Sequence, residues 1–292
     1  MSDELNILLT NDDGYQAGGI HSLADMMRQF GRITAVAPKF HQSGMSMAVS
    51  LGLKPIAYRN FGHFNPNPFT GGAEDSAVWS YIDATPASCV KFGLNNVFPE
   101  KFPDVVVSGI NHGSNAATAS CYSGTLGAAE EAALNGIPAI GVSLDTIHPD
   151  ADFSAVREYF GEIFKELIEN YPQRYGVYYN VNFPDIPASE IKGVRSSVQG
   201  IGHWVKEFKD WDPDIYKKYG ITPQLLGQPD SPAIEEGEEL YMMVGDFMDD
   251  ERNGDRADHK LMEQGYVSIT AHNVDCTDYQ EHERLKCLDR NF

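Results

Sequence analysis

Two adjacent carboxylates, Asp12 and Asp13, follow directly on an apolar run near the start of the chain, Leu5–Thr10. Such a run is typical of a strand that is buried on both faces of a parallel sheet. Open α/β sheets bind ligands at the carboxyl ends of these strands. Neighbouring carboxylates repel each other unless a cation or a shared proton relieves the repulsion. The stretch therefore indicates a site for a hard cation such as Mg²⁺ or Mn²⁺, or, equally, a turn that caps the next helix.

Oxygen-bearing side chains follow two later predicted strands as well. Ser43 lies in a hydroxyl-rich loop after the strand predicted over 32–38, and Asn111 ends the β-branched run 103–111. Either residue alone is more often a loop-stabilising residue. A doubly wound sheet would nevertheless gather these loops and the two aspartates on one edge. Together they form the incomplete oxygen shell that Mg²⁺ prefers, with positions left for water and phosphate.

A possible anion pocket precedes the helix predicted over 126–135, where the sequence reads Ser123-Gly124-Thr125. Backbone N–H groups and the positive end of a helix dipole attract anions at such a position. An ordinary N-cap is the alternative, and the local sequence by itself favours it. Beside a divalent cation, however, the pocket suits a phosphate, and the combination indicates metal-assisted phosphoryl chemistry. His112 is either a general acid for the leaving alkoxide or a solvent-facing loop residue.

The elements that must position these residues alternate between strands and helices. A strand–helix–strand unit occupies about the first forty residues and predicts a doubly wound α/β fold. Further strands are expected over 51–59, 77–83, 137–143, 177–183, 191–198 and 265–271, and helices over 18–30, 86–94, 126–135 and 153–171.

The composition changes from Gly200 onward, where aromatic residues such as Trp204, Trp211 and Tyr216 alternate with charges and prolines. This segment ends in the acid-rich stretch 235–258 and predicts a protruding arm with a strand at Glu239–Gly245. A neighbouring subunit is one place where its aromatic residues would be buried. We expect a single domain with its core at about 4–199 plus 259–275. The arm would span about 200–258, and a terminal helix about 276–292.

The bulk composition excludes several classes of function. With 42 acidic against 22 basic residues, the net charge of −20 argues against binding to a nucleic-acid duplex. The four cysteines are scattered and form no Cys-x-x-Cys pair, which fits a reducing compartment. Neither a secretory signal nor a membrane-spanning run is evident, so we expect a cytoplasmic protein with no membrane partner.

Several motifs, taken in chain order, resemble those of the SurE family of stationary-phase survival proteins. They are Thr10–Gly14, Gln42–Gly44, Thr85-Pro86, Val107–Asn115, Tyr122–Thr125, Asn180–Pro184 and Gly265–Thr270. The resemblance covers most of the chain. Ala84 and Ala271 depart from the usual pattern outside the metal loops, and the arm is longer and more acidic than usual.

The resemblance implies a three-layer α/β/α fold with a Rossmann-like core and a mostly parallel sheet. It also implies a C-terminal arm exchanged in a homodimer or homotetramer. Family members are metal-dependent 5'/3'-nucleotidases, also described as acid phosphatases, and some attack short polyphosphate. One divalent ion per subunit, Mg²⁺ or Mn²⁺, would be held by Asp12, Asp13, Ser43 and Asn111. The expected phosphate- or substrate-binding residues are Asn11, Gly44, Gly109, Asn115, Ser123, Gly124 and Thr125.

Our mechanistic hypothesis is attack on the phosphate by a metal-activated water, with Asp12 and Asp13 as catalytic residues. One aspartate would act as a ligand and the other as general base, and the sequence does not divide these roles. Two alternatives stay open. One is a covalent aspartyl-phosphate enzyme, and the other is a non-catalytic sensor of nucleotides or phosphoproteins.

Overall fold

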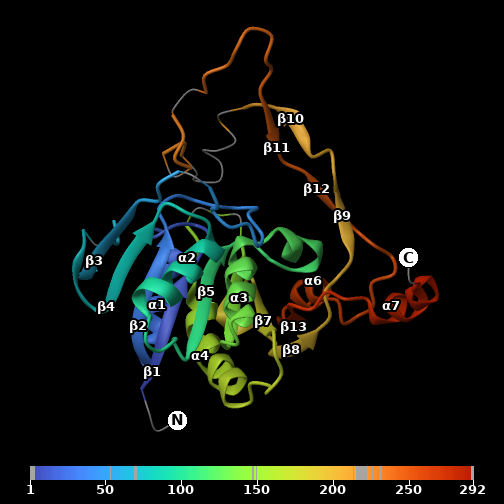
Figure 1. The fold of residues 1–292 in the computed structure, drawn as a ribbon, viewed down its shortest axis with the longest axis horizontal. Coiled ribbons are helices and arrows are strands. Elements are labelled where there is room, and N and C mark those ends of the chain that lie inside the picture. The colour runs from blue at the N-terminus through green and yellow to red at the C-terminus, as the bar shows by residue number, and fades with distance from the viewer. Residues whose placement is uncertain are drawn as a thin grey trace.

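The computed structural model describes residues 4–52, 54–68, 71–146, 148, 150–212, 214, 222–224, 226–229 and 232–290. Within them, nine strands form a central sheet that is mostly parallel (Figure 1). In spatial order they are β3 (Tyr58–Asn65), β4 (Ala73–Ile82), β2 (Gly31–Pro38), β1 (Leu5–Thr10), β5 (Val105–His112), β6 (Ala139–Asp145), β7 (Val177–Pro184), β13 (Val267–Asn273) and β8 (Val194–Ser197). Within this sheet, only the β3–β4 and β7–β13 pairs are antiparallel.

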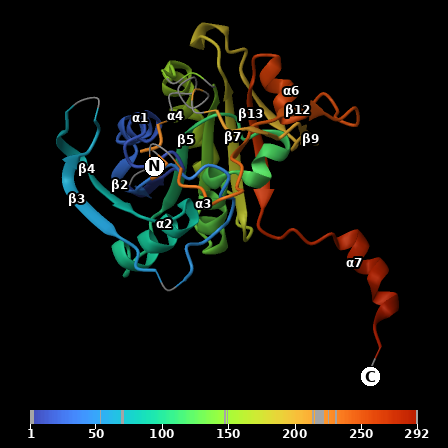
Figure 2. The same ribbon diagram turned by 90° about the horizontal axis from the view of Figure 1, so that it is seen from above.

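Helices cover both faces of this sheet, as Figure 2 shows from above. The α-helices are α1 (Gly18–Met27), α2 (Pro86–Phe92), α3 (Gly124–Leu134), α4 (Ser154–Glu169), α6 (Asp258–Glu263) and α7 (Tyr279–Leu285). Short 3₁₀ or π segments occupy Gly93–Val97, Ala117–Tyr122, Ala188–Glu190 and Lys286–Leu288. Side chains of α1 and α4 pack into one apolar core and those of α2 and α3 into another, on opposite faces of the sheet. The predicted three-layer α/β/α architecture is confirmed.

The central strands are buried because both of their faces are covered, as the apolar run in β1 predicted. Leu5 lies opposite Gly31 in β2, and Ile7 lies opposite Val105 in β5, both in parallel register. The carboxyl ends of β1, β2 and β5 consequently reach the same edge of the sheet. That edge carries the loops on which the predicted ligands lie.

The strand predicted over 51–59 was wrong in its position. The structure places the strand at Tyr58–Asn65, antiparallel to β4, and the described residues of 51–57 form no strand. Just before that segment, Ser50 is hydrogen-bonded to the start of α2: Ser50 N donates to Ser88 Oγ at 2.8 Å, and Thr85 N donates to Ser50 Oγ at 3.0 Å.

A long ribbon leaves the core after β8 and returns to it before α6 (Figure 1). Strand β9 (Gly202–Val205) pairs antiparallel with β12 (Asp246–Asp249), and β10 (Phe208–Asp210) pairs with β11 (Tyr241–Met243). The predicted protruding arm is therefore present. Its strand β11 is shorter than the strand predicted at Glu239–Gly245. Trp204 packs edge-on against Phe247, and Tyr216 lies outside the described residues.

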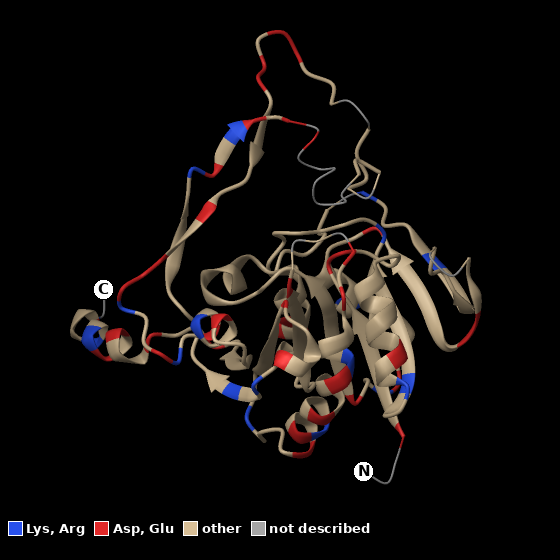
Figure 3. Ribbon diagram, turned by 180° about the vertical axis from the view of Figure 1, so that it is seen from behind, with Lys and Arg blue, Asp and Glu red and all other residues tan. Residues whose placement is uncertain are grey.

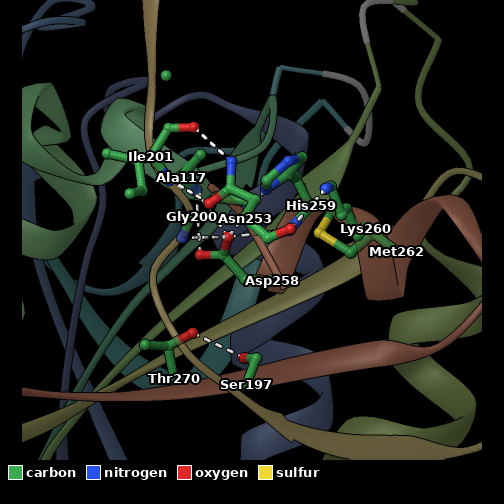
Figure 4. Close-up of polar contacts among 12 residues, drawn as sticks. Ala117, Ser197, Gly200, Ile201, Asn253, Asp258, His259, Lys260, Met262 and Thr270 are labelled. Atoms are coloured by element: carbon green, nitrogen blue, oxygen red, sulfur yellow. Dashed lines mark hydrogen bonds and ion pairs between the residues drawn. The ribbon is translucent and has the colours of Figure 1, made fainter. Parts of the chain in front are cut away.

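A buried carboxylate, that of Asp258, joins the two ends of the arm (Figure 4). It accepts backbone hydrogen bonds from Ala117 at 3.0 Å, from Gly200 at 3.0 Å and from His259 at 2.9 Å. Gly200 lies where the chain enters the arm, and Ala117 begins the short helix that leads to α3. Asp258 thus connects the base of the arm to the segment before the predicted anion pocket.

Replacing Asp258 by alanine should lower the free energy of unfolding by about 3 kcal/mol or more, because three backbone N–H donors, two of them buried, would lose their acceptor. Urea unfolding measures the loss, and limited proteolysis should show earlier cleavage near Gly200. Asp255→Ala, at an exposed position three residues away, is the control and should be neutral. Equal stability of the two variants would contradict this role of Asp258.

His21 of α1 should make the stability of the protein sensitive to acid. Its ring is buried against Trp79, with ring centroids 4.5 Å apart, and burial lowers its pKa to about 4. Between pH 6.5 and 4 the unfolded chain therefore binds a proton at this site that the folded chain does not. Stability should fall by up to about 3 kcal/mol as the pH drops through this window.

The fall that His21 causes should be absent in His21→Phe, whose ring does not titrate. Unfolding by urea at pH 7 and pH 4.5 measures the difference for both proteins. His63→Gln, at an exposed position of β3, should behave as the unmodified chain. An unchanged pH dependence in His21→Phe would contradict the assignment.

Candidate active site at the carboxyl edge of the sheet

Asp12 follows β1 and lies against the first turn of α3. The residue is only 4% exposed, and Thr125 Oγ1 donates a hydrogen bond to its Oδ1 at 2.6 Å. A Cβ on Gly124 would lie 2.9 Å from the Asp12 Cβ and 3.1 Å from Oδ2. The absence of a side chain at Gly124 therefore allows the N-terminus of α3 to approach this carboxylate.

Asp13 joins the β1 loop to the two neighbouring strand ends. Its Oδ2 accepts a hydrogen bond from the backbone N of His112, the last residue of β5, at 3.2 Å. Its Oδ1 lies 3.2 Å from Nδ1 of His41, which lies in the loop after β2. The three loops that the sequence analysis assigned to one edge therefore meet at Asp13.

The two carboxylates repel each other in a largely buried setting. Burial, followed by the charge of Asp13, raises the pKa of Asp12 to about 6, although the Thr125 hydrogen bond opposes this shift. Burial lowers the pKa of His41, but the hydrogen bond and the charge of Asp13 outweigh it and raise the pKa above its usual value. An additional positive charge beside Asp12 and Asp13 would stabilise both carboxylates.

His41 is a site residue that the sequence analysis missed. Its Nε2 lies 2.5 Å from Oγ of the exposed Ser43, while its other ring nitrogen contacts Asp13. A ligand-type side chain two residues before Ser43 in the same loop was the available signal. Ser43 is thus connected to the aspartates through His41.

Asn111 lies at the end of β5 and is 8% exposed. Its amide nitrogen donates to the carbonyl oxygen of Gly113 at 2.7 Å, and in the described part of the chain its amide oxygen accepts no hydrogen bond. The oxygen is therefore available as a ligand. Next to it, Nε2 of His112 is buried without a hydrogen-bond partner among the described residues, which disagrees with a solvent-facing side chain.

Ser123 acts as the N-cap of α3. Its Oγ accepts a hydrogen bond from the backbone N of Leu126 at 3.0 Å, which was the alternative that the local sequence favoured. With this cap in place, the positive end of α3 lies beside Asp12 through Gly124 and Thr125.

Other predicted substrate residues contact mainly the protein itself. Asn11 is buried and exchanges hydrogen bonds with the backbone of Gly14. Asn115 is buried and donates from its side chain to Ser143 Oγ at 2.9 Å. A Cβ on Gly109 would lie 2.3 Å from the carbonyl oxygen of Val142, so the absence of a side chain there allows close strand packing. Gly44 is exposed, with a φ of 75°.

A glycine in α3 allows the Ser43 loop to pack closely against this helix. A Cβ on Gly127 would lie 1.9 Å from the carbonyl oxygen of Ser46. Ser46 N donates to the carbonyl oxygen of Tyr122 at 3.0 Å, and its Oγ donates to that of Cys121 at 2.9 Å. The loop that carries Ser43 is therefore packed directly on the N-terminal part of α3.

The available donors fit a hard divalent cation. Among the residues that the structure describes, no group of three or more His, Cys, Asp or Glu side chains is arranged to hold a metal. A cation at this edge would therefore need hydroxyl and amide oxygens in addition to Asp12 and Asp13. Ser43 and Asn111 offer those two donors on neighbouring loops, and an all-oxygen set suits Mg²⁺ or Mn²⁺.

Lys and Arg are dispersed over the core, the arm and α7 (Figure 3). Within the described residues, no helix is long and apolar enough to cross a membrane.

Comparison with known proteins identifies relatives over nearly the whole chain. The family model described as "Survival protein SurE" matches residues 7–206. The 5'-nucleotidase SurE of Christiangramia forsetii is 34% identical over 275 residues, which are 93% of this chain and 92% of the relative. The protein of the same description from Chlorobium phaeobacteroides is 40% identical over 203 residues, which are 69% of this chain and 73% of the relative.

A solved structure supports the same relationship. The crystal structure of the SurE protein from Aquifex aeolicus has a TM-score of 0.73 and 27% sequence identity, and the match covers 97% of this chain and 99% of that chain. The family model spans well over half of the chain. This chain belongs to the SurE family.

Proposed function

We propose that the protein is a metal-dependent phosphomonoesterase that hydrolyses nucleoside 5'- and 3'-monophosphates to nucleoside and phosphate, with short polyphosphate as a further substrate. The observation that carries the proposal is the buried Asp12 beside the positive end of α3, with the partly buried Asp13 next to it in the chain. A cation and an anion would be attracted to adjacent positions there. The curated relatives named as 5'-nucleotidases support the choice of substrate.

One divalent ion per subunit, Mg²⁺ or Mn²⁺, would be held by Asp12, Asp13, Ser43 and Asn111. When bound, the ion supplies positive charge to the phosphoryl oxygens and lowers the pKa of the attacking water. The all-oxygen donor set and the raised pKa of Asp12 support this assignment.

The chain's own groups would bind and orient the phosphate. The backbone N–H groups of Gly124 and Thr125, in the first turn of α3, would hold phosphoryl oxygens. Thr125 Oγ1 also orients Asp12, and the backbone N–H of His112 orients Asp13. One of the two carboxylates would accept the proton of the attacking water, and His112 would protonate the leaving alkoxide.

A phosphate-release screen tests this function. Nucleoside 5'- and 3'-monophosphates and polyphosphate are incubated with the protein and with Mg²⁺, Mn²⁺ or EDTA. We expect phosphate release with at least one monophosphate and either cation, and none with EDTA. Measurable nucleotide binding without phosphate release under any of these conditions would contradict the proposal and favour a non-catalytic sensor.

Direct attack by water differs from a covalent aspartyl-phosphate path in where oxygen from the solvent appears. In a single turnover in ¹⁸O-water with excess enzyme, direct attack places the label in phosphate. Label in the protein carboxylate would instead indicate an aspartyl-phosphate intermediate.

We also infer that the arm joins subunits into a homodimer or homotetramer. Large apolar side chains on its strands are exposed in the single chain, including Phe208, Tyr241 and Met243. Exposed apolar groups of this kind are typical of a subunit interface. Sedimentation should give a mass of two or four chains, and a monomer at micromolar concentration would contradict the inference. We expect the protein to act in the cytoplasm, which cell fractionation tests.

A further inference from the structure

His41 lies between two proposed ligands that come from different strands. Its Nδ1 is 3.2 Å from Oδ1 of Asp13, and its Nε2 is 2.5 Å from Oγ of Ser43. The imidazole is mostly buried, with its side chain 18% exposed, whereas Ser43 itself is exposed. The ring is therefore better fixed by its surroundings than the hydroxyl that it contacts.

The hydrogen-bond pattern determines which group donates the hydrogen in the contact between His41 and Ser43. An ionised carboxylate is only an acceptor, so the His41 nitrogen that faces Asp13 must carry the hydrogen. A cation beside Asp13 favours the neutral imidazole, in which the other nitrogen is an acceptor, and the Ser43 hydroxyl then donates its hydrogen to it. Both lone pairs of Ser43 Oγ are left available for a cation.

We propose that His41 is a positioning residue that accepts the Ser43 hydroxyl hydrogen and so directs the oxygen lone pairs toward a divalent cation beside Asp13. The inference rests on the proposed metal-dependent function and names a residue that the ligand set omits. Among the described residues, His41 is the only side chain that forms a hydrogen bond with Ser43. Ser43 has no other side-chain partner there to orient it.

The loop around Ser43 is fixed on both sides but not at Ser43 itself. Gln42 N donates to the carbonyl oxygen of Asp12 at 2.6 Å, and Ser46 is hydrogen-bonded to the carbonyl oxygen of Tyr122. Loss of the His41 ring should therefore leave the path of the loop intact and release only the hydroxyl. Residues that hydrogen-bond to a metal ligand typically account for 10- to 100-fold in metal affinity.

Titration with Mn²⁺, followed by electron paramagnetic resonance without substrate, measures this effect. His41→Leu has a side chain of similar size without polar atoms, and it should weaken Mn²⁺ binding about 10-fold or more. His41→Gln should stay within about 3-fold, because its carboxamide offers one donor and one acceptor. His63→Ala, at an exposed position of β3, is the control and should bind as the unmodified chain.

A double-mutant cycle with Ser43→Ala separates orientation of the hydroxyl from a general effect on the loop. The loss caused by His41→Leu should be at least about 3-fold smaller in the Ser43→Ala background, because no hydroxyl remains to be oriented. Equal losses in both backgrounds, or no loss in the first, would overturn the role of His41. If His41→Leu does not fold, as judged by thermal unfolding without metal, His41→Ala replaces it in the cycle.

Failure of the proposed function would give a different experimental result from failure of the role of His41 alone. If the unmodified chain binds no Mn²⁺, the metal centre is wrong and the role of His41 is overturned with it. If the unmodified chain binds Mn²⁺ but the cycle shows no coupling, only the role of His41 is overturned.

Discussion

Asp12→Asn and Asp13→Asn should each reduce phosphate release from nucleoside monophosphates by about 10³-fold or more. Both carboxylates lie at the junction of the β1, β2 and β5 loops, where Thr125 orients Asp12 and the backbone of His112 orients Asp13. Asparagine keeps the shape of each side chain but removes the negative charge that attracts a cation. The loss should therefore appear mainly in catalysis and in metal binding, and folding should be retained.

The stability of Asp12→Asn without metal provides a second readout. Because the pKa of Asp12 is raised to about 6, the folded chain holds a proton there that the unfolded chain releases near pH 4. The corresponding stability is present below pH 4 and is lost as the pH rises through 6. At pH 7.5 the metal-free Asp12→Asn variant should thus be more stable than the unmodified chain, by up to about 3 kcal/mol.

Phosphate release at saturating Mg²⁺ or Mn²⁺ and urea unfolding in EDTA measure the two effects. Asp83→Asn, at an exposed position directly after β4, is the matched control on the same edge of the sheet and should change neither quantity. Full activity in both Asp12→Asn and Asp13→Asn would refute the candidate site.

Gly127→Ala should reduce activity by about 100-fold, although the residue carries no functional group. Its added Cβ would lie 1.9 Å from the carbonyl oxygen of Ser46. Backbone atoms do not yield as a flexible side chain does, so the loop that carries Ser43 must move away from α3. A displacement of about 1 Å in a positioning element costs about 10²-fold in rate.

Gly161→Ala is a matched control for Gly127→Ala because both glycines lie within α-helices. At Gly161 the nearest atoms to an added Cβ are side-chain atoms of Gln29 and Phe30 at 3.5 Å. This substitution should leave activity unchanged and add about 0.5–1 kcal/mol of stability through helix propensity. Phosphate release and Mn²⁺ binding distinguish the variants, and equal activity of Gly127→Ala and Gly161→Ala would show that the packing of the loop is unimportant.

Local patterns in the sequence determined much of the architecture. The apolar run before Asp12 predicted a buried central strand, and alternating strands and helices predicted a doubly wound α/β fold. Thr85 and Pro86 predicted the start of α2, where Thr85 accepts a hydrogen bond from Ser88 N. These predictions succeed because burial periodicity and helix capping depend on residues close together in the chain.

Only the tertiary structure decided which side chains meet at the site. Thr125 and Asp12 are separated by 113 residues, and Ala117 and Asp258 by 141. Neither spacing nor composition encodes such contacts, because they depend on how strands order themselves in the sheet and where loops pack. The prediction of a strand over 51–59 was wrong for the same reason, because the pairing with β4 places that strand at Tyr58–Asn65.

His41 illustrates the difference between what the sequence predicted and what only the tertiary structure determined. The sequence by itself determined that Asp12, Asp13, Ser43 and Asn111 follow strands that end on one edge. Which side chain orients the Ser43 hydroxyl depends on distances between ring nitrogens and oxygens from two loops. Hydrogen bonds require alignment to within a few tenths of an ångström, and only the packed structure specifies positions at that scale.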